Sequence, residues 1–234
     1  MKKNKTIHAI WLGGTPNSFS NACIDDWEKQ GFTYKVWLDD NPQIQNLIAD
    51  CEFARECYKR GLYAFVTDYL RLKILSLEGG LYLDTDVTIT KDPFPLFEGL
   101  HFAAGWESDK FLGNAIIYAE KDSKILAKIV DFYENEIMSS PLYMGPKVLS
   151  HKLTVDKFQD LEPCRLFEQA YFYAYDGEKL LDINSDIPRY MTHWYQHSWK
   201  SNKGIIFLKS KHKNFWGKLY THQKYLFKLK GKFF

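Results

Sequence analysis

Strands and helices alternate in the hydrophobic pattern of the first 90 residues. Residues 6–12 and 32–40 alternate apolar and polar positions as strands do, and glycine or proline residues follow each of them. Residues 43–59 are predicted to be helical, and residues 61–78 form the clearest helix, which two glycines end. A third strand is predicted over residues 81–89. This alternation is typical of an α/β fold with a largely parallel sheet.

The pattern is less regular in the remainder of the chain. Strands are predicted over residues 101–107 and at the start of residues 113–137, whose second half reads as a helix. A short helix is predicted after the Gly-Pro break within residues 144–153. With 234 residues and no internal repeat, we expect one catalytic domain over residues 1–200 and a tail over residues 201–234.

Two aspartates, Asp84 and Asp86, occupy the predicted strand at residues 81–89. Alternate residues of a strand share a face, so their carboxylates would lie roughly 6–7 Å apart along the chain. Like charges at this separation raise each other's pKa unless a cation lies beside them, and a hard divalent ion with oxygen ligands relieves the conflict. An Asp-x-Asp pair is also common in solvated loops, so the pair alone leaves both interpretations open.

The acid pair follows a strand at a place where α/β sheets bind ligands. Trp11 and Asp39 fall at the ends of the first two predicted strands, as the acids do at the third. In open α/β sheets, ligands bind beyond the carboxyl ends of the strands. This convergence favours a functional site over a solvated loop.

A longer pattern surrounds the acids. From Ala64 to Asp86 the sequence reads A-x3-D-x2-R-x7-GG-x-Y-x-D-x-D, which resembles the Asp-x-Asp sugar-binding region of glycosyltransferase family 32. That family contains capsular polysaccharide and mannosyl transferases, and the large clostridial glucosylating toxins share a related core. "IHAIWLGG" (residues 7–14) resembles its first strand, and "HWYQHSW" (residues 193–199) resembles its closing element. The resemblance implies a glycosyltransferase-A type fold, with a mostly parallel nucleotide-binding sheet flanked by helices.

The resemblance also implies a reaction. We expect a metal-dependent retaining glycosyltransferase that moves a hexose from a nucleotide-diphosphate sugar, with a UDP-sugar favoured, to a saccharide acceptor. A divalent ion, Mn²⁺ or Mg²⁺, would neutralise the charge that grows on the leaving diphosphate. Asp86 is the expected direct ligand, and Asp84 is expected to contact the metal or its water, the ribose or the sugar. Since no second carboxylate is clearly placed as a nucleophile, front-side attack assisted by the diphosphate is expected.

Asp68 and Arg71 have two interpretations. Three residues apart on a predicted helix, they can form a surface ion pair worth a few tenths of a kcal/mol. The resemblance instead implies catalytic roles, in which the carboxylate accepts hydrogen bonds from sugar hydroxyls and the guanidinium donates to them. Asn114, after a glycine at a predicted strand start, is a further candidate for contact with the sugar or the acceptor. Asp92 is expected only to cap a loop.

Three residues are expected to bind the nucleotide. The resemblance implies that Trp11 packs against the base. Gly13 follows it closely and would let the backbone approach the nucleotide. Tyr82 shares the predicted face of the acids and belongs to the same group.

The closing element supplies the remaining candidates. His193 is the expected third metal ligand, although His197 is an alternative for the same position. Ser198 is expected to help complete the metal site, and Trp199 to donate its indole N–H to a phosphate. These four assignments follow from the resemblance, not from the spacing of the residues.

The net charge of +2 conceals an asymmetry. After Asp186 the chain has no acidic residue, whereas Arg189 and ten lysines follow, interleaved with aromatic residues and leucine. Such a segment fits an anionic membrane surface, where the apolar side chains bury and the lysines meet phosphates. The alternatives are a helix packed on the body with a solvated basic face, and nucleic acid, which no accompanying motif supports.

The cellular localisation is predicted from the apolar stretches and the cysteines. No stretch reaches the roughly 18 apolar residues of a membrane span, and the first apolar run is too short for a secretory signal. The four cysteines are expected to be reduced thiols. We therefore expect a cytoplasmic protein at the inner face of a membrane, where a lipid-linked saccharide would be the acceptor in surface polysaccharide assembly.

Two other functions fit parts of the pattern. "LYLDTDVTI" also fits the phosphatases of the haloacid dehalogenase family, with Asp84 as nucleophile, but two strands precede it and the later Gly-Asp metal motif is absent. A non-catalytic, metal-dependent carbohydrate-binding protein would use the acids and aromatic residues, but it would leave Asp68 and Arg71 without a role.

Overall fold

A computed structural model describes residues 4–181, 187–196 and 204–230 of the chain. Six of its described strands form one large sheet with the order β2-β1-β3-β6-β5-β7: β1 (Ile7–Trp11), β2 (Tyr34–Leu38), β3 (Gly80–Leu83), β5 (Phe102–Trp106), β6 (Leu112–Ala119) and β7 (Cys164–Phe167). β1 pairs in parallel with β2 and β3, and β5 pairs in parallel with β7. β6 runs antiparallel to β3 and β5. The predicted α/β fold with a mostly parallel sheet is confirmed.

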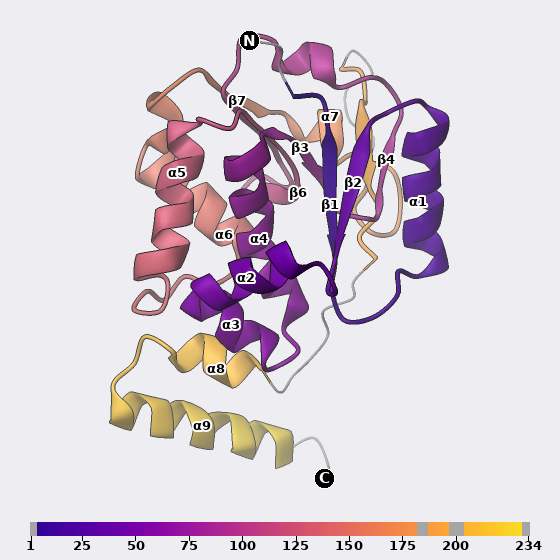
Figure 1. Cartoon of the computed structure of the whole chain (residues 1–234). Helices are drawn as coiled ribbons and strands as arrows, with labels where there is room; N and C mark the ends of the chain where they lie inside the picture. Colours follow the sequence, from indigo (N-terminus) through magenta and orange to yellow (C-terminus); the bar gives the residue numbers. More distant parts are fainter. Residues whose placement is uncertain (1–3, 182–186, 197–203, 231–234) are drawn as a thin grey trace.

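Helices and a small second sheet cover the two faces of the large sheet (Figure 1). Each face has its own buried apolar cluster. One face carries α2 (Pro42–Asp50), α3 (Glu52–Tyr58), α4 (Tyr63–Glu78), α5 (Lys124–Asp131) and α6 (Gly145–Ser150). The other carries α1 (Ser18–Lys29), α7 (Gln169–Phe172) and the antiparallel pair of β4 (Val87–Ile89) and β8 (Met191–His193).

Helix α4 carries Asp68 and Arg71 and packs on one face of the large sheet. Its apolar residues bury on several sides, and Asp68 and Arg71 are buried with them. The helix ends at Gly79 (φ 67°), and Gly80 (φ 112°) begins β3. A Cβ on Gly80 would lie 2.5 Å from the carbonyl oxygen of Thr6, so only glycine permits this close approach to the start of β1. The two glycines therefore deliver the chain directly from α4 into the strand that precedes the acids.

The structure corrects two predicted elements. The strand predicted over residues 81–89 is two strands, because β3 ends at Leu83 and a turn over residues 84–86 leads into β4. The amide of Val87 donates to the carbonyl oxygen of Asp84 (3.1 Å), which closes that turn and moves the chain to the second sheet. The helix predicted over residues 43–59 is α2 followed by α3, since the extended backbone of Cys51 (ψ 117°) separates them.

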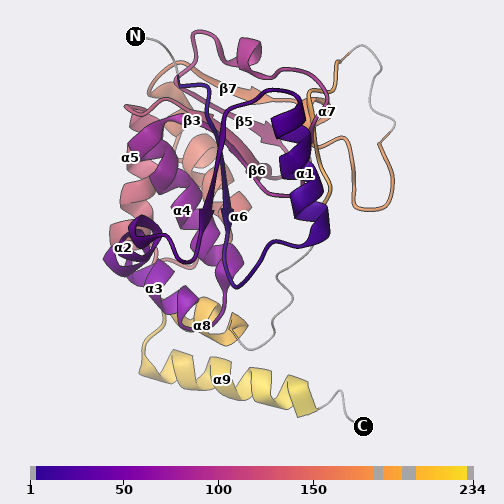
Figure 2. The same ribbon diagram turned by 45° about the vertical axis from the view of Figure 1, so that its right-hand side comes forward.

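The basic segment near the C-terminus is helical. α8 (Ile205–Ser210) packs on the body through Leu208 and through the ammonium group of Lys211, which donates to the carbonyls of Ile137 and Ser140. α9 (Phe215–Lys230) packs on α8, at the end of the molecule toward which β1 and β2 point (Figure 2). The domain boundary predicted at residue 200 falls outside the described residues. None of the helices in the described part is long and apolar enough to cross a bilayer.

Candidate active site

Three potential metal ligands meet where β3 gives way to β4. One ligand atom each from Asp84, Asp86 and His193 lies within 4.8 Å of the others. The turn after β3 presents the two carboxylates, and the pairing of Val87 with His193 places the imidazole beside them. The sequence points to these three residues, but it places Asp84 and Asp86 on one straight strand with their carboxylates farther apart. The turn is what brings the carboxylates together.

Each carboxylate oxygen of Asp86 has a partner in the protein. Its Oδ1 lies 3.3 Å from Nε2 of His193, and its Oδ2 accepts a hydrogen bond from the amide of Gln196 (2.8 Å). Burial acts to raise the pKa of Asp86, but the hydrogen bond and charge of His193, with the Gln196 amide, lower it below its ordinary value. Asp86 is therefore an anion at neutral pH, which is the state that a metal ligand requires.

The pKa of His193 is raised above its ordinary value, whereas that of Asp86 is lowered. Burial acts to lower its pKa, but Asp86, Asp84 and Glu107 together raise it. Its Nδ1 atom is buried and has no hydrogen-bond partner among the described residues. These carboxylates favour the charged form of His193, whereas a divalent cation would bind its neutral imidazole. Two carboxylate oxygens and one imidazole nitrogen suit Mn²⁺, and they can also hold Mg²⁺ when substrate oxygens complete the shell.

Arg71 is the central residue of the network behind the acids. Its Nη1 donates to Asp84 Oδ1 (3.1 Å) and to the carbonyl oxygen of Asn114 (2.6 Å). Its Nε and Nη2 donate to the backbone and hydroxyl oxygens of Thr67, and Nη2 also pairs with Asp68 Oδ1 (3.4 Å). These five protein partners match the five N–H groups of a guanidinium. Arg71 therefore links α4, β6 and the turn, instead of forming the surface ion pair that was the alternative.

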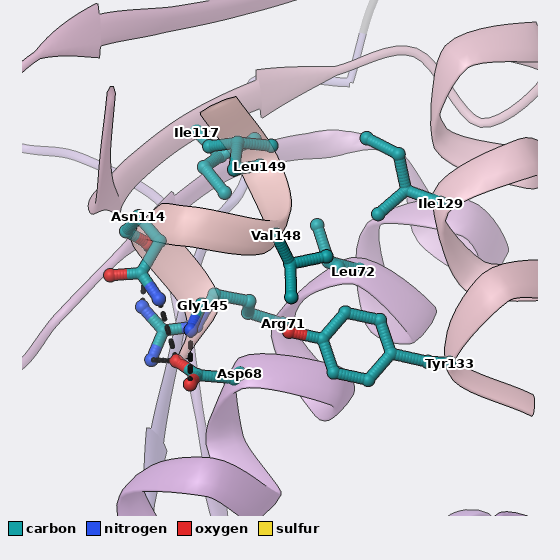
Figure 3. A pocket seen from close by; sticks show the side chains of 10 residues that line it. All are labelled: Asp68, Arg71, Leu72, Asn114, Ile117, Ile129, Tyr133, Gly145, Val148 and Leu149. Atoms are coloured by element: carbon teal, nitrogen blue, oxygen red, sulfur yellow. Dashed lines mark hydrogen bonds and ion pairs between the residues drawn. The ribbon is translucent and has the colours of Figure 1, made fainter. Parts of the chain in front are cut away.

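Asp68 lies at one end of a cavity of about 10 Å³ that Arg71, Asn114 and Gly145 also line (Figure 3). Its Oδ1 accepts from Asn114 Nδ2 (2.6 Å) and its Oδ2 from the Gly145 amide (2.9 Å). Burial is the largest influence and raises the pKa of Asp68 to about 6, although Arg71 and the two hydrogen bonds act against it. The structure thus joins Asp68, Arg71, Asp84 and Asn114, the four predicted catalytic residues, in one hydrogen-bonded group.

Gly145 was missed as a site residue, although the Gly-Pro break that contains it was noted. A Cβ at this position would lie 2.0 Å from Asn114 Nδ2 and 2.5 Å from Asp68 Oδ1. Glycine is therefore required for α6 to begin against these two side chains. A Gly-Pro pair before a short helix is the sequence signal, but its partner cannot be identified without the fold.

Tyr82 is a hydrogen-bond donor to Asp84. Its side chain is buried, its hydroxyl donates to Asp84 Oδ1 (2.7 Å), and the Arg71 guanidinium lies 4.6 Å from the centre of its ring. The tyrosine therefore positions the Asp84 carboxylate, and its contact with the nucleotide stays a prediction.

The loop after β1 is held by Asp39. The amide of Gly13 donates to Asp39 Oδ2 (2.5 Å), and the hydroxyl of Tyr58 donates to Oδ1 (3.2 Å). Gly13 has a φ of 87°, and a Cβ there would lie 2.4 Å from the Tyr63 ring. Trp11, at the end of β1, has a buried indole nitrogen without a hydrogen-bond partner among the described residues. The stacking of Trp11 on a base stays a prediction.

The remaining candidates have mixed outcomes. His197, Ser198 and Trp199 lie outside the described residues. Asp92 caps the turn before Phe94 by accepting its amide (3.0 Å), as predicted.

Glu107 and Tyr195 are polar neighbours of the metal-ligand cluster that were not predicted. The Tyr195 ring lies 4.2 Å from that of His193, and its hydroxyl is hydrogen-bonded to the Glu107 carboxylate. Burial raises the pKa of Glu107, which also senses the charges of His193 and Asp84. Glu107 ends a predicted strand, so its place in the sequence was the available signal.

Comparison with known proteins points to one family. A model of the glycosyltransferase sugar-binding region containing the DXD motif matches residues 17–102. This stretch contains Asp84 and Asp86, so the match supports a glycosyltransferase of the DXD type and agrees with the family 32 resemblance.

Two curated proteins match parts of the chain. Subversion of eukaryotic traffic protein A of Legionella pneumophila is 25% identical over 166 residues, which are 58% of this chain and 26% of that protein. A glycosyltransferase of Acanthamoeba polyphaga mimivirus is 30% identical over 95 residues, which are 37% of this chain and 36% of that protein. The chain therefore spans about a quarter to a third of the lengths of these relatives.

A solved structure shares the fold of this chain. The UDP-bound glycosyltransferase domain of the YGT toxin superposes with a TM-score of 0.50 and 10% identity, over 69% of this chain and 78% of that one. The glycosyltransferase-A type fold expected from the sequence is confirmed.

Proposed function

We propose that the protein is a metal-dependent retaining glycosyltransferase that moves a hexose from a nucleotide-diphosphate sugar to a saccharide acceptor. The observation that carries this proposal is the meeting of Asp84, Asp86 and His193 within 4.8 Å at the end of β3. The match to the DXD glycosyltransferase region supports the reaction class, and the trio offers a place for the cation. A UDP-sugar is the favoured donor, in keeping with the UDP bound to the similarly folded toxin domain.

Asp86 and His193 would hold the cation directly, and Asp84 would hold it directly or through water. When bound, the ion acts as a Lewis acid that stabilises negative charge on the leaving diphosphate. The protein itself fixes these ligands before substrate arrives, because Tyr82 and Arg71 both donate to Asp84 and the Gln196 amide donates to Asp86. Preorganisation of this kind limits the rearrangement that binding requires.

Asp68 and Asn114 are the proposed sugar contacts. Both are joined to Asp84 through the Arg71 guanidinium, and the carboxylate of Asp68 keeps lone pairs for hydroxyl donors after accepting from Asn114 and Gly145. We assign Arg71 a positioning role, since its N–H groups are engaged by protein acceptors. Trp11 and Gly13, at the carboxyl end of β1, would receive the nucleotide base.

The transfer reaction exchanges one bond to the anomeric carbon for another. The bond from that carbon to the diphosphate oxygen breaks, the bond to the acceptor oxygen forms on the same face, and the acceptor's hydroxyl proton passes to the leaving diphosphate. This front-side course accounts for retention without a protein nucleophile. It also leaves the acids of the turn free to act as ligands.

Helices α8 and α9 support a further part of the proposal, which is attachment to an anionic membrane. Phe215, Trp216 and Tyr220 of α9 are 72%, 73% and 65% exposed, and lysines surround them. Aromatic side chains that bury at the interface, next to cations that meet headgroup phosphates, are typical of interfacial helices. A lipid-linked saccharide at the inner face, as in capsular polysaccharide assembly, would then be the acceptor.

Release of nucleoside diphosphate from a panel of sugar nucleotides tests the reaction. The native protein is expected to release it from one or two donors with Mn²⁺, and to stop when a chelator is added. Asp86→Asn should lower the rate at least about 100-fold, and the loop-capping Asp92→Asn should leave it within about twofold. Activity that survives both the chelator and Asp86→Asn would refute the metal-dependent reaction.

A further inference from the structure

A groove of about 230 Å³ opens beside the site, at the ends of β5 and β7. These strands pair in parallel, with Gly105 opposite Phe167, so the residues that follow them are neighbours. Carboxyl ends of parallel strands are where α/β sheets place ligands. The groove is lined by Trp106, Ser108 and Asp109 after β5, and by Glu168 and Gln169 after β7.

Glu107 connects the groove with the metal-ligand cluster. Its side chain is hydrogen-bonded to Tyr195 and senses the charges of His193 and Asp84, whereas its sequence neighbours Trp106 and Ser108 line the groove. The carbonyl oxygen of Glu107 accepts a hydrogen bond from Gln169 Nε2 (2.8 Å), which fixes this wall to the opposite lip. The wall of the groove is therefore continuous in sequence with a residue that interacts with the metal-ligand cluster.

The lining has the chemistry of a saccharide site. A half-buried indole can stack on the C–H face of a sugar ring, while hydroxyl, amide and carboxylate groups pair with its hydroxyls. The two carboxylates, Asp109 and Glu168, would repel a phosphate, so the groove suits a neutral sugar better than the diphosphate of the donor. Its volume is below the roughly 300–1,000 Å³ of sites for drug-sized ligands, which limits the occupant to about one sugar ring.

We propose that this groove is the acceptor subsite, in which the terminal sugar of the acceptor stacks on Trp106. The assignment rests on the proposed glycosyltransferase reaction. It gives the partly exposed tryptophan at the end of β5 a ligand, and it makes Glu107 the partition between donor and acceptor. It also gives the acceptor a route to the anomeric carbon from the side of β5 and β7.

The experiment separates transfer to water from transfer to sugar. Donor hydrolysis is measured without acceptor, using the sugar nucleotide that the native protein turns over. Transfer is then measured with a panel of 4-nitrophenyl hexosides. Trp106→Leu and Glu168→Gln are expected to raise the acceptor KM about tenfold or more while hydrolysis stays within about twofold. The exposed Glu98→Gln on another face is the matched control and should change neither.

The outcomes distinguish the two proposals. No release of nucleoside diphosphate by the native protein refutes the proposed function itself. Hydrolysis that persists while no hexoside is glycosylated, or while both groove variants keep the native acceptor KM, overturns the subsite. A parallel fall of hydrolysis and transfer in Trp106→Leu also overturns it, since the groove would then belong to the donor.

Discussion

Nη1 of Arg71 lies 3.1 Å from Oδ1 of Asp84, and this pair joins α4 to the turn after β3. Arg71 forms a second ion pair, with Asp68, and both of these side chains are largely buried. One guanidinium thus neutralises a metal-ligand candidate and a sugar-contact candidate. Because a buried charge without a partner is costly, removing the guanidinium should affect both folding and turnover.

Arg71→Met is expected to lower the free energy of unfolding by about 3–5 kcal/mol, since it leaves Asp68 and Asp84 as uncompensated anions. Urea unfolding measures this change. Lys59→Met, which removes an exposed ion pair with Glu56, is the matched control and should cost less than about 1 kcal/mol. Equal losses in the two variants would mean that the buried pair contributes no more than a surface pair.

Asp68 should make stability depend on pH in a definite direction. Its pKa is about 6 in the folded protein against 3.8 ordinarily, so between these values the folded state binds more protons than the unfolded state. The unfolding free energy of the native protein, relative to Asp68→Asn, should therefore fall as pH rises from about 4 to 6.5, by on the order of 3 kcal/mol. Urea titrations at several pH values measure this difference.

The pH dependence of this stability difference can also contradict the prediction. A difference that stays flat or rises with pH would show that Arg71 and the hydrogen bonds from Asn114 and Gly145 outweigh burial. Asp68 would then be an ordinary ionised carboxylate.

Mn²⁺ should stabilise the native protein in the absence of any sugar nucleotide. A ligand at 100 times its Kd adds about 2.7 kcal/mol, which corresponds to a rise in Tm of about 5–10 °C for a chain of this size. His193→Ala and Asp86→Asn should abolish the rise because each removes a ligand of the cluster. Asp92→Asn should retain it. A thermal shift of the same size in all four proteins would place the metal elsewhere.

Much of the fold was predictable because local pattern determines it. The strand ending at Trp11, the helix carrying Asp68 and Arg71, and the glycines after it follow from periodicity and turn residues. The family pattern added the association of that helix with the two acids. These features lie within one continuous stretch of chain, so their spacing is visible in the sequence.

The rest of the site depends on contacts between distant segments. Alternation over residues 81–89 reads as one strand, and only the pairing of β4 with β8 shows why the chain turns at Asp84. Gly145 matters because of the space that Asn114 and Asp68 occupy, which no local pattern records. Glu107 likewise gains its role from Tyr195, which is far along the chain.

The exposed face of α9 leads to the last prediction. Trp216 and Tyr220 are one helical turn apart and share a side of the helix, and both are largely exposed. The double variant Trp216→Ser/Tyr220→Ser should weaken binding to vesicles that contain anionic phospholipid by about tenfold or more, in a sedimentation assay. Binding by the native protein should fall as salt rises, because the lysines contribute by charge, and it should be weak on neutral vesicles.

Val155→Ser is the control for this double variant, since Val155 is 64% exposed on a different part of the surface. The Val155→Ser substitution should leave vesicle binding unchanged if the aromatic face of α9 is the specific contact. Equal effects of both variants would instead indicate general surface hydrophobicity. Native protein that ignores anionic vesicles would refute membrane attachment while leaving the sugar-transfer site untouched, because Trp216 and Tyr220 belong to α9 and the metal-ligand cluster to the β3–β4 turn and β8.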